Sequence, residues 1–314
     1  MKDFGIKFQL IIKPFLVIGI TSISAYSFIH WWLFVRNEIF AVDEAILNFF
    51  VPLATSFIPV LIWLLPRLKL LDFTGKKAKN PVIGYLLMAA IAIGVPTVIA
   101  QEYLISATGE MTVLTSIKEI EKRPKTKYYT LKKVYPDKAQ ARPNTIINTS
   151  GKYNVNYNMA VYMPCPIFDT PNAHQAAEPL AWLGIKYQKT ISNGLSGAEK
   201  TQEFEMFTKK SQDDFDKRDL TTFTYLDRIG PSSELKTFAD AVTFSGVYDT
   251  PFIILVPRWG NFEDRNGDKG LWLIVSLVIG TVLFILMIAA VPLRDRALKN
   301  DLNGYNFEPY KLDQ

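Results

Sequence analysis

The sequence is poor in the residues that build covalent cross-links and metal centres. The 314-residue chain contains one cysteine, Cys165, and two histidines, His30 and His174. A single cysteine excludes an intrachain disulfide, and a protein metal site needs three or four convergent ligands. We therefore expect no metal and no cofactor, and we expect the soluble part of the chain to be held by its own apolar core.

Charged residues are nearly absent from four long stretches, which cover residues 15–35, 46–65, 81–100 and 271–293. Each stretch is about 20 residues long, so a helix formed by it would cross the ~30 Å hydrocarbon core of a bilayer. Proline interrupts two of them, but membrane helices tolerate proline. The pattern predicts a membrane protein with four transmembrane α-helices, for which the lipid bilayer is the first partner.

The segment between the third and fourth apolar stretches is polar and large enough to form a domain. The sequence therefore predicts three parts: a three-span membrane region over 1–102, an α+β domain over 103–268, and a fourth span with a tail over 269–314. Basic and acidic residues are almost balanced in the domain, although the whole chain carries a net charge of +5. A mixed surface of this kind gives no reason to expect nucleic acid as a partner.

The basic residues flank the apolar stretches unevenly. They precede the first stretch, are numerous in the segment between the second and third, and follow the fourth. The segment between the first and second stretches differs, because its one basic residue, Arg36, is outnumbered by Glu38, Asp43 and Glu44. Short basic segments stay on the cytoplasmic side. We therefore expect both termini in the cytoplasm of a cell (inner) membrane and residues 103–268 outside it. The basic residues are Lys2, Lys7, Lys13, Arg67, Lys69, Lys76, Lys77, Lys79, Arg294, Arg296 and Lys299.

The apolar stretches offer little chemistry. Their polar residues are expected to be small hydroxyls, without the carboxylates or lysines that proton and ion pathways use. His30 is expected to join Trp31, Trp32 and Phe34 in an aromatic cluster at the membrane interface. The spacings Ala90 to Gly94 and Ser276 to Gly280 are typical of closely packed membrane helices. A transporter subunit is therefore the least favoured function.

The polar segment reads as a mixture of strands and helices. Apolar residues three apart predict a juxtamembrane helix from Met111 to Ile120, which Pro124 would end. Ser196 and Ser233 open predicted helices over 197–217 and 233–242. Runs rich in Tyr, Thr, Val and Ile predict strands at 128–135, 145–149, 156–163, 181–190, 223–228 and 252–256.

Two motifs resemble catalytic or metal sites. Gly194-Leu195-Ser196-Gly197 matches the GxSG string of an intramembrane serine nucleophile, but polar residues surround it and Glu199 completes a helix capping box with Ser196. Residues 264–268 begin like a calcium loop, but Lys269 replaces the turn glycine of that loop. We predict a helix cap and a solvated turn, and hence no catalytic, cofactor-binding or metal residue.

Four phrases resemble the long N-terminal region of some bacterial rhomboid-family proteins, which precedes their catalytic core. These are Thr126–Lys138 (TKYYTLKKVYPDK), Ala181–Ser192 (AWLGIKYQKTIS), Tyr225–Gly230 (YLDRIG) and Phe262–Gly267 (FEDRNG). The catalytic six-helix core of that family has no counterpart in this chain, because only a short polar tail follows Leu293. The resemblance therefore implies a membrane-anchored accessory region and carries no protease activity.

These observations favour a non-catalytic membrane accessory or scaffold protein. Its outer domain would dock or position a membrane or periplasmic protein. The alternative is a subunit related to rhomboid-type intramembrane proteases that another chain completes.

Overall fold

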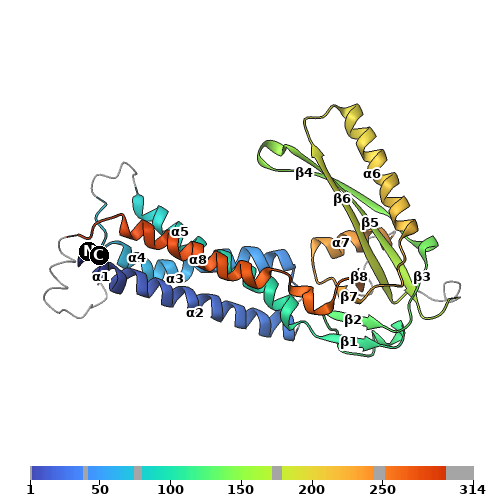
Figure 1. The fold of residues 1–314 in the computed structure, drawn as a ribbon, viewed down its shortest axis with the longest axis horizontal. Helices are drawn as coiled ribbons and strands as arrows, with labels where there is room; N and C mark the ends of the chain where they lie inside the picture. The colour runs from blue at the N-terminus through green and yellow to red at the C-terminus, as the bar shows by residue number, and fades with distance from the viewer. Residues whose placement is uncertain (1, 38–41, 74–79, 172–178, 244–251, 295–314) are drawn as a thin grey trace. The chain divides into compact units, whose positions relative to one another are not determined.

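The computed structural model describes residues 2–37, 42–73, 80–171, 179–243 and 252–294. Several residues of the sequence argument lie outside this set, namely Glu38, Lys76, Lys77, Lys79, His174, Arg296 and Lys299. The chain divides into two compact units (Figure 1). One joins residues 1–108 to 266–314, and the other comprises residues 109–265. The second unit is thus an insertion in the first, and each is described by itself below.

The first unit, called the membrane unit below for its apolar helices, contains four helices long and apolar enough to cross a membrane, as predicted, although the last of them begins in the final residues of the second unit. They run Asp3–Arg36, Ile46–Leu68, Pro81–Thr108 and Phe262–Ala289. The first three extend beyond the predicted apolar stretches, whereas the fourth begins before its stretch and ends before residue 293. Two of them include π-helical turns. The segments are α1 (Lys2–Lys7), η1 (Phe8–Ile12), α2 (Lys13–His30), η2 (Trp31–Arg36), η3 (Ile46–Phe50), α3 (Val51–Pro59), η4 (Val60–Leu64), α4 (Leu65–Leu68), α5 (Pro81–Thr108) and α8 (Lys269–Ala289).

Helix α5 packs against the other three long helices through small residues. A Cβ atom on Gly94 would lie 2.9 Å from Leu53 of α3, and one on Gly280 of α8 would lie 3.0 Å from Ala92 of α5. A Cβ on Gly19 of α2 would lie 3.5 Å from Ile93. The predicted close packing at Gly94 and Gly280 is confirmed, because larger side chains there would hold the helices apart.

One end of the bundle is tied by polar contacts between distant parts of the chain. The Lys7 Nζ, although the residue is buried, donates to the Ala289 carbonyl at 3.1 Å, at the C-terminal end of α8 where a cation is favoured. Nearby, the Asp72 amide donates to Pro292 (2.8 Å) and the Arg294 amide donates to Leu70 (3.0 Å). The first and last helices of the unit are therefore fastened directly to each other.

The inserted unit is built on one mixed eight-stranded sheet. Its strands run in the order β1-β2-β7-β8-β6-β5-β3, and β4 pairs with β5 beyond this path. The pairs β1–β2 and β6–β8 are parallel, and the others are antiparallel. The strands are β1 (Met111–Leu114), β2 (Tyr128–Leu131), β3 (Tyr135–Pro136), β4 (Asn144–Ser150), β5 (Asn156–Phe168), β6 (Ala181–Ser192), β7 (Tyr225–Arg228) and β8 (Ile254–Arg258).

A helix covers each face of this sheet. Phe207 and Phe215 of α6 (Gly197–Lys217) pack on a core that includes Met159 and Val161 of β5. On the other face, α7 (Ser233–Val242) inserts Phe238 against Tyr162 and Trp182. Alternate residues of β5 thus enter opposite cores. The two predicted helices are confirmed to their ends.

The predicted juxtamembrane helix is wrong. Its residues form β1, which pairs with β2, followed by the 3₁₀-helix η5 (Ile117–Glu119). Leu114, Ile117 and Ile120 are all buried in the sheet core. The apolar spacing therefore marked burial correctly, but a strand and a 3₁₀ turn satisfy that spacing as well as an α-helix does.

Strand β5 is longer than predicted, because the prediction ended before Pro164 and Pro166. A proline lacks a donor but keeps its acceptor. The Pro164 carbonyl accepts from the Arg142 amide at 3.1 Å, and the Pro166 carbonyl accepts from the Asp137 amide at 3.0 Å. Both prolines therefore stay within a strand that is buried on both faces.

Candidate functional site

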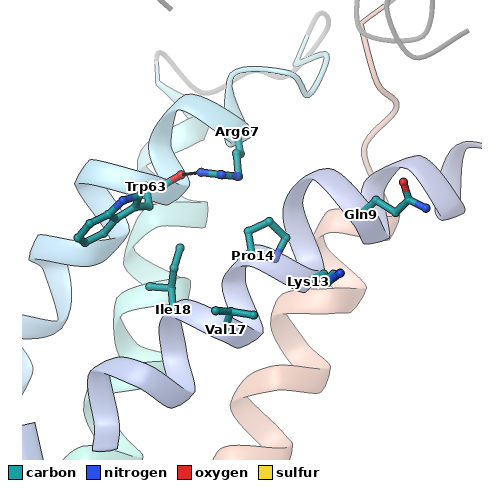
Figure 2. A pocket seen from close by; sticks show the side chains of 7 residues that line it. All are labelled: Gln9, Lys13, Pro14, Val17, Ile18, Trp63 and Arg67. Carbon is teal, nitrogen blue, oxygen red and sulfur yellow. Dashed lines mark hydrogen bonds between the residues drawn. The ribbon is translucent and has the colours of Figure 1, made fainter. Parts of the chain in front are cut away.

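A groove of about 360 Å³ opens between the first two long helices of the membrane unit (Figure 2). This volume falls in the range of small-ligand sites, about 300–1,000 Å³. The first helix contributes Gln9, Lys13, Pro14, Val17 and Ile18, and the second contributes Trp63 and Arg67. Gln9 lies in the π-helical η1 and Trp63 in η4, and π-helical turns occur frequently at functional sites.

The groove has two cations and no acid in its lining. The Arg67 guanidinium donates to the Trp63 carbonyl, as the dashed line in Figure 2 marks, and this bond fixes the guanidinium beside the groove. Among the described residues, neither Lys13 nor Arg67 has a carboxylate within ion-pair distance. The groove therefore combines unneutralised positive charge with apolar walls.

A buried polar cluster lies elsewhere in the membrane unit. The fully buried Gln101 donates from Nε2 to the Ser27 Oγ (3.0 Å) and to the Thr97 carbonyl (2.9 Å). The Tyr26 hydroxyl donates to the Leu47 carbonyl at 2.7 Å. These bonds join the first helix to the second and third, which is the role that polar side chains usually have between membrane helices.

His30 lies in the same region of the bundle. The residue is 3 % exposed and lies between the Tyr26 and Phe34 rings, whose centroids are 6.1 Å and 5.5 Å from its own. Its side chain is therefore buried and contacts Phe34, one of the aromatic residues expected beside it. The sequence reading also missed Gln101, because this residue lies one position beyond the apolar stretch that ended at residue 100.

Ser196 is a helix cap, as predicted. Its Oγ accepts from the Glu199 amide at 3.3 Å, and its own amide donates to the Glu199 carboxylate at 2.8 Å. The Ser196 hydroxyl also donates to the Glu199 carboxylate at 2.7 Å. This bond and the bond from the Ser196 amide lower the pKa of Glu199. No described histidine lies in the sheet unit, and the lowered pKa makes the Glu199 carboxylate a weak base toward this serine.

Strand β4 leaves one edge of the sheet open. It pairs with β5 along seven residues, and no described backbone group bonds to its other side. Natural edge strands are blunted by lysine, proline, bulges or short length, but β4 (NTIINTS) has neither charge nor proline. Ile147 on the strand is 45 % exposed, and Tyr153 and Val155 in the following loop are 85 % and 54 % exposed. The edge is thus an unprotected template for another strand.

The remaining candidates show no reactive chemistry. Cys165 is fully buried, and burial is the main cause that raises the pKa of its thiol to about 12, so it is protonated and inert at neutral pH. Asp264 accepts a side-chain hydrogen bond from Asn261 at 3.3 Å, within a turn. No cluster of three or more possible metal ligands occurs within the described ranges.

Comparisons with known proteins return no matching family model, no matching curated protein and no matching solved structure.

Proposed function

We propose that this chain is a membrane-anchored docking protein whose sheet domain binds an extended segment of another cell-envelope protein along β4. The open, uncharged edge of β4 is the observation that carries the proposal. Strand addition satisfies the exposed backbone groups of such an edge, and side chains beside it supply specificity. No chemistry at the described residues favours an enzyme instead.

The exposed apolar residues favour a partner over a second copy of the chain. A second β4 strand that paired antiparallel with the first would end at Ser150. Tyr153 and Val155 would then remain uncovered. A longer segment of a different protein can pair with β4 and continue past its end to cover both side chains, which removes more apolar surface from water.

Photocrosslinking in cells tests this docking edge. With a photoreactive amino acid at Asn148, we expect one discrete adduct with another envelope protein. Ile147→Lys should lower the yield of this adduct at least tenfold, because a lysine on an edge strand opposes strand addition. The adduct is measured by immunoblot and identified by mass spectrometry.

Met206→Lys is the matched control, because Met206 is 48 % exposed and lies on α6, away from the edge. Its adduct yield should stay within twofold of the unmodified chain. An equal loss in both variants, or an adduct of twice the mass of this chain alone, would refute the partner proposal.

The docking role also requires the sheet domain to lie outside the cytoplasm, and we propose this orientation from the basic residues that flank the helices. Single cysteines at Lys69 and Asp213, both exposed, test it because the buried Cys165 should not react. In intact spheroplasts, an impermeant maleimide should label Asp213→Cys, whereas Lys69→Cys should be labelled only after lysis. The opposite result would invert the topology, and equal labelling of both would contradict the four-span arrangement.

A role as a rhomboid-type protease subunit remains the alternative proposal. It rests on the phrases that resemble that family, and the capped Ser196 gives it no nucleophile. The docking proposal needs no second catalytic chain, and the identity of the crosslinked protein separates the two.

A further inference from the structure

We propose that the groove between the first two membrane helices binds one anionic phospholipid, whose phosphate is held by Lys13 and Arg67. This site is independent of the docking function, because it lies wholly within the membrane unit. Its argument rests on the charge of the lining, on its depth along the helices and on the apolar surface that continues from it.

The charge of the groove selects an anion. Lys13 and Arg67 line the groove from different helices (Figure 2), and no carboxylate is among the lining residues. One guanidinium N–H is engaged by the Trp63 carbonyl, which leaves other donors of the arginine fork for an incoming phosphate. Gln9 adds a neutral amide donor to the lining. Phosphate is an anion that each of these side chains can bind.

The depth of the two cations matches the phosphate layer of a bilayer. Lys13 lies two residues before the apolar stretch 15–35, and Arg67 lies two residues after the stretch 46–65. Each stretch is about as long as the hydrocarbon core is thick. Trp63 lies one helical turn from Arg67, where aromatic rings are enriched in membrane proteins. Basic pockets between membrane helices bind anionic headgroups at this level.

The walls of the groove continue into lipid-exposed surface. Val17 and Trp63 line the groove and are 56 % and 51 % exposed, and Ile20 and Ile62 beyond it are 60 % and 56 % exposed. An acyl chain attached to the bound headgroup can therefore lie along these side chains. A soluble phosphate compound would gain nothing from this surface, and so we assign the site to a phospholipid.

Native mass spectrometry of the full-length chain in detergent measures the first lipid bound. Dioleoyl phosphatidylglycerol should bind at least tenfold more tightly than dioleoyl phosphatidylcholine. The double variant Lys13→Gln/Arg67→Gln should lose this preference, with at least a tenfold weaker affinity for phosphatidylglycerol. The exchanged variant Lys13→Arg/Arg67→Lys keeps both charges and should bind within threefold of the unmodified chain.

Lys69→Gln/Arg294→Gln is the matched control, since it removes the same charge from exposed positions at the same end of the unit, outside the groove. Its affinity should stay within twofold. An equal loss in both double variants would show general attraction of anionic lipid to basic residues, and no loss in either would remove the groove as a site. Glycerol 3-phosphate at millimolar concentration should not displace the lipid; displacement would assign the groove to a soluble phosphate compound.

Discussion

Phe238→Ala is expected to cost the sheet domain about 3–5 kcal/mol of unfolding free energy. Phe238 is 1 % exposed, and its ring packs edge-on against Tyr162 with a centroid distance of 5.0 Å. It is the largest side chain that α7 places in the core on its face of the sheet. Gly184 of β6 leaves room for this ring, because a Cβ there would lie 3.0 Å from it. Truncation would leave a cavity between α7 and the sheet that strands β5 and β6 cannot fill.

Hydrogen exchange of the full-length chain in detergent measures this loss along β5 and β6. A cost of this size should raise the exchange rates of the slowest amides at least a hundredfold, since about 1.4 kcal/mol corresponds to a factor of ten. Tyr153→Ala is the control, because its side chain is 85 % exposed and its removal should change stability by less than about 0.5 kcal/mol. A similar small effect for Phe238→Ala would mean that α7 does not stabilise the sheet.

Gly280→Leu is expected to separate α8 from α5. The Cβ position of Gly280 lies 3.0 Å from both the Cα and the Cβ of Ala92, so the new side chain would meet backbone that cannot rotate away. Overpacking a tight interface costs about 1–3 kcal/mol, and occasionally more. We expect a clear fall in the midpoint of thermal unfolding of the purified protein in mild detergent. Size-exclusion chromatography of heated samples measures this midpoint.

Gly84→Leu separates this steric effect from the change in residue type. Gly84 also lies in one of the long apolar helices, but no atom of the described residues, apart from the adjacent backbone of its own helix, lies within 4 Å of its Cβ position. Leucine is the better helix former, so this variant should be as stable as the unmodified protein or slightly more so. Equal thermal midpoints for the two leucine variants would contradict the close packing of α5 and α8.

Long periodic features were predictable from the sequence. The four apolar helices follow from length and composition alone, and α6 followed from its capping box. These signals are local, so the sequence of one segment is enough to predict that the segment forms a helix. The segment at Met111 was misread because its three-residue apolar spacing does not distinguish an α-helix from a strand that continues into a 3₁₀ turn. Pairing with β2 decides the outcome, and that contact is not local.

The candidate sites depended on contacts that no single segment encodes. Lys13 and Arg67 are ordinary flanking cations in the sequence, and only the packing of two helices brings them to one groove. The open edge of β4 likewise depends on the strand order, because a neighbour beyond β4 would have closed it. His30 contacts Tyr26 and Phe34 of its own segment, but only the packing of the other helices buries it.

The contact between Lys7 and Ala289 has a consequence for the time course of synthesis. The two residues are 282 positions apart, and a ribosome that adds about 5–20 residues per second needs roughly a quarter of a minute to a minute to cover that distance. Throughout this interval the Lys7 ammonium lacks the carbonyl that accepts its hydrogen bond, and α8 is not yet present to pack against α5. A nascent chain that is released before Ala289 emerges therefore keeps the Lys7 ammonium without this acceptor and leaves uncovered the face of α5 that α8 packs against.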